Sequence, residues 1–161
     1  MKIEADHTLE RFLRQLQRAP SAIMRHVDQA VQRAAILGAR DAKRAAPKSL
    51  SELANSIRNE QLGLAFHRVL ADAPHARHVE EGTGPGGSPP LDILRAWIRT
   101  AQIQPREARN VRDLAFLIQR KIRRTGTPAQ PYMAPQVDTS RARLLRMLPQ
   151  AIRQGAEEAA L

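Results

Sequence analysis

The sequence predicts a helix-rich α+β fold, with long N-terminal helices, a small antiparallel sheet of about three to four strands, and further helices packed on it. Long stretches of helical apolar spacing flank a middle segment with short apolar runs of the kind that form strands. Aromatic residues make up only 3% of the chain, so Leu, Ile, Val and Ala must build the core. A length of 161 residues predicts a single domain, with a helical part at 1–46 and a sheet-plus-helix core at 47–161.

Two helices are predicted in the N-terminal part. The first follows Thr8, a good N-cap, and ends at Pro20. The second is capped by Ser21 and continues to about Ala46, before Pro47. Small residues lie on its apolar face and predict close approach of another backbone. They are Ala30, Ala34 and Gly38.

The middle of the chain predicts the sheet. A hairpin is expected with strands near 55–61 and 65–71, turning around Leu62 and Gly63. The segment His75–Glu81 is expected to form a third strand.

Three helices are predicted after the sheet. One covers Leu91 to about Ala101 and faces inward with Leu91, Leu94, Trp97 and Ile98. The next is capped by Asn110 and stopped by Gly126. The last covers about 139–160 and is expected to bend at Pro149. The apolar stripe of the second of these helices consists of Val111, Leu114, Leu117, Ile118 and Ile122.

Composition limits the class of protein. The chain has no cysteine, which excludes disulfides and thiolate metal sites and fits a reducing cytosol. We find neither a signal peptide nor an apolar run of about 20 residues, and expect a soluble product without a membrane partner.

The formal charge of +10, from 26 basic and 16 acidic residues, favours a polyanion or an acidic protein as partner. The alternative is a set of solvated helix faces. The densest cluster of positive charge ends the helix before Gly126, where cations also complement the helix dipole. It consists of Arg120, Lys121, Arg123 and Arg124.

Several short motifs resemble cofactor, metal or catalytic sites but lack the neighbouring elements that such sites require. Residues 82–87 match G-x-G-x-x-G, but Pro85 removes an amide and no helix opens directly on the glycines, so we expect no cofactor. A metal site needs three or four converging ligands, and the sequence shows no second cluster that could complete one, so we expect no metal. No serine lies in a nucleophile-elbow context, and we expect no enzyme. The metal ligands considered were His75, His78, Glu80 and Glu81.

A proline-rich strap follows Gly126. Pro128, Pro131 and Pro135 hold an extended backbone around Tyr132, the only tyrosine of the chain. Tyr132 either covers the core of its own subunit or docks on a neighbour, and the sequence leaves both open. The loop Glu81–Pro90 is expected to be mobile in the free subunit and to order against a neighbour.

Three separated blocks resemble the tail-completion, or head–tail joining, family of tailed bacteriophages (the gene-product-ten-like family of lambdoid phages). The first is Ala46-Pro47 with Glu52–Ile57, the second is Ala76–Thr83, and the third extends from Lys121-Ile122 through Gly126-Thr127 to Pro135. Order and spacing agree over about residues 40–140. His75 and Glu81 depart from the family pattern, which has a tyrosine and an aromatic residue there.

The resemblance implies a structural virion protein, located at the neck or tail and assembled in the host cytoplasm. Its partners would be copies of itself in a ring, expected to be hexameric, and neighbouring neck, connector and tail proteins. Contact with genome DNA in the channel is left open. The expected subunit or partner interface consists of Glu80, Glu81, Gly82, Thr83, Arg120, Lys121, Arg123, Arg124, Gln130, Pro131, Tyr132 and Pro135.

Two other classes remain as alternatives. A basic nucleic-acid-binding module would gather its arginines on one face and bind duplex DNA with steep salt dependence. A hydrolase would require a deep polar pocket.

Overall fold

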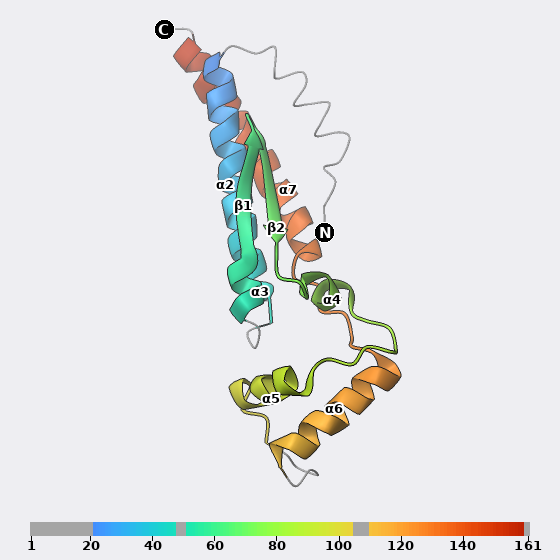
Figure 1. Ribbon diagram of the computed structural model, residues 1–161. Helices are drawn as coiled ribbons and strands as arrows, with labels where there is room; N and C mark the ends of the chain where they lie inside the picture. Colours follow the sequence, from blue (N-terminus) through green and yellow to red (C-terminus); the bar gives the residue numbers. More distant parts are fainter. Residues whose placement is uncertain (1–20, 48–50, 105–109, 160–161) are drawn as a thin grey trace.

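A computed structural model describes residues 21–47, 51–104 and 110–159. The helix expected between Thr8 and Pro20 lies outside these residues. The described part forms a long body and, at one end of it, a smaller pair of helices (Figure 1). In chain order the elements are α2 (Ser21–Ala45), α3 (Ser51–Ser56), β1 (Ile57–Gly63), β2 (Phe66–Ala71), α4 (Ala76–Glu81), α5 (Leu91–Thr100), α6 (Val111–Thr125) and α7 (Ala134–Ala159).

Helices α2 and α7 lie side by side and antiparallel along the body (Figure 1). Glycines allow the close approach: a Cβ on Gly38 would lie 2.5 Å from the Ser140 hydroxyl, and one on Gly155 would meet the backbone of Ile23. The sequence prediction that α2 offers a small-residue face to another backbone is therefore confirmed, and α7 is the partner.

Ion pairs also connect the two long helices. Arg143 of α7 donates to the Asp41 carboxylate of α2 at 2.8 Å. Near the other end Glu158 pairs with Arg25, and with His26 at 2.8 Å. These bonds with Arg25 and His26 lower the pKa of Glu158, the His26 bond most. These ion pairs lie near both ends of the helix pair.

The predicted hairpin is confirmed, with its turn slightly later than expected, at Leu64 and Ala65. It packs on α2, where the Ala65 amide donates to Asp28 at 2.8 Å and His67 lies 3.5 Å from the same carboxylate. The sheet has two strands in the described residues, fewer than the three to four expected.

The third predicted strand is wrong, because the segment after His75 forms the short helix α4. One side of this helix packs into the body through Ala76 and Val79. The side chain of Glu80 on the same helix is also buried. Tertiary contacts, rather than strand pairing, therefore determine the local structure.

Helices α5 and α6 pack mainly on each other and form what we call the arm, residues 91–125 (Figure 1). Asn110 caps α6 as predicted, its side chain accepting from the Asp113 amide at 2.9 Å. The buried core of the arm is small and consists of Leu94, Ile98 and Ala115. Leu117, predicted to face inward, is 47% exposed instead.

Helix α7 begins earlier than the predicted residue 139, directly after Met133. Pro135 lies in its first turn, where a proline is tolerated because that amide has no partner within the helix. Pro149 lies inside α7, and the bend expected there stays a prediction. Among the described residues no helix is both long and apolar enough to span a bilayer.

Candidate functional site: the junction between body and arm

Two segments of chain connect the arm to the body, and both contain residues predicted to form the interface. We call residues 79–86 and 126–134 together the junction. At its centre the Glu80 carboxylate, only 6% exposed as a residue, accepts three backbone amides. The donors are Tyr132 and Met133 at 2.8 and 2.9 Å, and Ala134 at 2.8 Å.

The three amides lie directly before and at the start of α7, where the first helical amides have no partner within the helix. A carboxylate at this position also interacts favourably with the helix dipole. No described cation pairs with Glu80, so amide dipoles alone stabilise its buried charge. Glu80 therefore holds α4 against the first turn of α7. It is not available to a partner, and its predicted role at an exposed interface is wrong.

A second connection joins the two Gly-Thr pairs of the junction. The amide of Thr83 donates to the Thr127 carbonyl at 3.0 Å, and the Thr127 amide donates back to the Thr83 carbonyl at 3.2 Å. The two hydroxyls lie 2.9 Å apart. This isolated antiparallel bridge ties the chain that enters the arm to the chain that leaves it.

The glycines before both threonines are required by this geometry. Gly82 and Gly126 each have φ of 74°, a conformation that side-chain-bearing residues rarely adopt. A Cβ on Gly82 would lie 2.7 Å from the Thr127 carbonyl oxygen. A Cβ on Gly126 would overlap the Thr83 carbonyl. Only glycine at positions 82 and 126 allows the two chain segments of the junction to approach this closely.

Further bonds extend the junction on both sides. The Gln130 amide donates to the Val79 carbonyl at 2.8 Å, and the Gly86 amide donates to the Arg123 carbonyl at 2.8 Å. Gln119 of α6 donates to the Pro89 carbonyl at 2.9 Å. The loop Glu81–Pro90 is bonded to the rest of the chain at Thr83, Gly86 and Pro89. The expectation that it is mobile in the free subunit stays a prediction.

Tyr132 is 1% exposed and packs into the core of the body. It packs in a cluster that contains the fully buried Leu53 and Ile57. The sequence left open whether Tyr132 covers the core of its own subunit or docks on a neighbour. Its burial shows that it covers the core of its own subunit. Burial, and secondarily the nearby charge of Glu80, raises the pKa of Tyr132 above its ordinary value of 10.0.

The remaining residues of the predicted interface lie at the surface or in the bridge. Glu81 is exposed and pairs with Arg77 at 2.8 Å, which raises the pKa of Arg77. Gln130, Pro131 and Pro135 are exposed around the buried Tyr132. The structure thus brings the acidic residues of the predicted interface close to its proline-rich segment. The four predicted cations Arg120, Lys121, Arg123 and Arg124 lie exposed on α6, in the arm.

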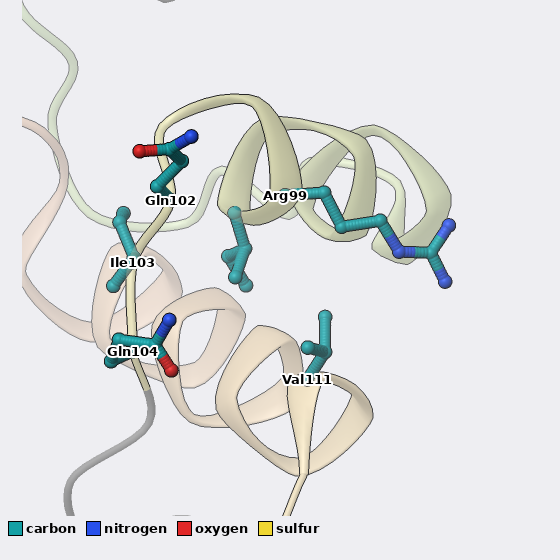
Figure 2. A pocket seen from close by; sticks show the side chains of 6 residues that line it. Arg99, Gln102, Ile103, Gln104 and Val111 are labelled. Atoms are coloured by element: carbon teal, nitrogen blue, oxygen red, sulfur yellow. The ribbon is translucent and has the colours of Figure 1, made fainter.

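Chemical sites are not evident in the part of the chain that the structure describes. No group of three or more His, Cys, Asp or Glu there could hold a metal ion. A hollow of about 540 Å³ opens on the arm, near Ile98, Ile103 and Val111 (Figure 2). Arg99 extends away from Ile103 in this view, and the described residues that line the hollow include no carboxylate or histidine.

Sequence reasoning missed the pairing of Thr83 with Thr127 and the role of the Glu80 carboxylate. Gly126 was interpreted as a helix stop and as part of the third block, but not as a position that pairs with residues 82–83. The available signal was the repeated Gly-Thr dipeptide, at 82–83 and 126–127.

Comparisons of the chain with models of known protein families, with curated proteins and with solved structures give no match. Its function must therefore be inferred from its own residues and their geometry.

Proposed function

We propose that the chain is a structural subunit of a tailed-phage virion, without catalytic activity, that forms a ring at the neck or the top of the tail and joins tail to head. The observation that carries this proposal is the convergence of three sequence blocks. Leu53 and Ile57 from the first block pack in one buried cluster with Ala76 from the second and Tyr132 and Met133 from the third.

Such convergence supports the resemblance, because the blocks lie far apart in the chain. Motif residues that meet in space can be retained together by a shared structural requirement, whereas chance matches have no reason to meet. The requirement is visible at Glu80, Thr83 and Thr127, whose bonds depend on the second and third blocks being present together.

The two-part shape suits a ring subunit. A head-to-tail ring requires two different surfaces on each copy, since every subunit contacts one neighbour on each side. The body and the arm supply two distinct surfaces, connected by a junction with defined geometry (Figure 1).

The test is electron microscopy of particles produced when this gene is deleted from its phage, with the intact gene supplied in trans as the control. The proposal predicts DNA-filled heads separate from tails, or tails of abnormal length, and restoration by the supplied gene. Normal, infectious particles in the deletion would refute it.

A further inference from the structure

The outer face of α6 carries cations and large apolar side chains along one ridge. Arg112, Phe116, Arg120 and Arg123 are spaced by three or four residues, so they follow one another along the same side of the helix. All four are exposed, Phe116 by 55%. Beside them, Leu117 is 47% exposed and Arg124 is exposed as well. We call these six residues the α6 ridge.

The arm holds most of the excess charge of the chain. Residues 91–125 contain nine Lys or Arg and three Asp or Glu, a formal charge of +6 out of the total +10. None of the four ridge arginines pairs with a described carboxylate. In the body, by contrast, arginines such as Arg58, Arg68 and Arg143 pair with carboxylates of the same chain.

Among the described carboxylates, four have no partner within the chain and lie scattered over α3, α6 and α7 rather than in one acidic cluster: Glu52, Asp113, Asp138 and Glu157. The other described carboxylates are already engaged within the chain, either in ion pairs or, as for Glu80, with backbone amides. Those engaged in ion pairs are Asp41, Glu60, Asp72, Glu81, Asp92 and Glu158, while Asp28 accepts the Ala65 amide. Charge complementarity therefore points to a different anionic molecule.

The apolar part of the ridge decides between two kinds of anion. A duplex would meet the arginines with phosphates but would leave Phe116 and Leu117 in water. A protein partner can bury both, and aromatic residues and arginine are the types enriched where protein interfaces carry most of their binding energy.

We infer that the α6 ridge binds a different protein, through a surface on it that has an apolar centre surrounded by carboxylates. Phe116 and Leu117 enter the apolar centre, and Arg112, Arg120, Arg123 and Arg124 pair with the carboxylates. This binding surface goes beyond the proposed ring, whose contacts are between identical copies, and it does not depend on the virion role.

The experiment measures binding of the full-length protein to three probes at moderate salt. The first is a synthetic helical peptide with leucines on one face and glutamates on both sides of it. The second has the same composition with the order scrambled, so that it has no apolar face. The third is a DNA duplex of random sequence.

The ordered peptide is expected to bind at least about tenfold more tightly than the other two probes. F116S should weaken this binding by about tenfold, as for a central interface residue. R120E combined with R123E should abolish it. R33E combined with R40E changes the net charge equally on exposed positions of α2 and should leave binding unchanged.

All altered residues are exposed, and thermal melts verify that each variant remains folded. Equal binding of the scrambled peptide would overturn the inference, because charge alone would then account for the interaction. Duplex binding that is tighter than peptide binding and insensitive to F116S would also overturn it, and would favour a nucleic-acid partner.

Discussion

The body and the arm differ in how closely their helices pack and in how many of their charged side chains pair within the chain. In the body, α2 and α7 pack closely against each other at small residues such as Gly38 and Gly155. Charged side chains of the two helices pair with each other, as Arg143 does with Asp41. The arm buries few side chains between its two helices, and the arginines on the outer face of α6 have no described carboxylate as partner. The difference indicates that the body stabilises the fold, whereas the arm presents a surface. The junction around Glu80 determines how that surface is held.

The largest expected effect comes from closing the space at Gly126. Gly126→Ala places a methyl group on the Thr83 carbonyl in a backbone conformation that alanine disfavours. We expect a loss of about 4 kcal/mol in the free energy of unfolding, at the upper end for single substitutions. Chemical denaturation measures it. Gly84→Ala is the matched control, because nothing lies within 4 Å of the added methyl group. Equal stability of the two variants would show that the Gly-Thr bridge does not form.

Truncation of Tyr132 should have the next largest effect. Tyr132→Ala is expected to cost on the order of 3 kcal/mol, as for other buried aromatic residues. Tyr132→Phe should be nearly silent, since none of the hydrogen bonds found among the described residues involves the Tyr132 hydroxyl. Thermal unfolding of both variants tests this, and equal damage from Phe and Ala would contradict the packing account.

Removing the charge of Glu80 tests the connection between α4 and α7. Glu80→Gln keeps the shape but replaces one acceptor oxygen by a donor that faces backbone amides. We expect a loss of about 2 kcal/mol, because hydrogen bonds to a charged group are lost and a buried donor is left unpaired. Glu81→Gln on the exposed neighbour is the control and should change stability by less than about 0.5 kcal/mol. Similar losses in both variants would argue against a specific role for Glu80.

The smallest expected effect is a shift in the titration of Tyr132. As the only tyrosine, it can be followed by near-ultraviolet absorbance, and its pKa should lie above 10.0. Because the pKa is higher in the folded state, the stability linked to Tyr132 is complete below about pH 10 and is lost as the pH rises through the folded-state value. In Glu80→Gln the pKa should fall only partly, since burial is the larger cause. A pKa at or below 10.0 in the folded wild type would contradict the burial of this side chain.

Local signals explain which parts of the fold could be predicted. Helix α2 between Ser21 and Pro47, the hairpin, and α6 from its Asn110 cap all follow from periodicity and from residues adjacent in sequence. Helix α4 could not be predicted in this way, because six residues form too short a pattern and the buried Glu80 is held by amides 52 to 54 positions away.

The candidate site was predicted only in part, for the same reason. Tyr132 and its prolines were recognised from their composition, but the bridge between Thr83 and Thr127 joins residues 44 positions apart. No local pattern specifies such a pairing. Of the α6 ridge, Arg120, Arg123 and Arg124 were recognised from the sequence by their charge. Leu117 was placed in the apolar stripe, and no role was assigned to Phe116.

Amide hydrogen exchange of the free protein tests the junction most directly. We expect protection at Thr83, Thr127 and the three amides bound by Glu80, with faster exchange at Gly84 and Gly87, which have open space around them. In Glu80→Gln, protection should fall at residues 132–134 more than in the middle of α2. Unprotected amides at Thr83 and Thr127 in the free wild-type protein would contradict this expectation, because body and arm would then be connected only by flexible chain.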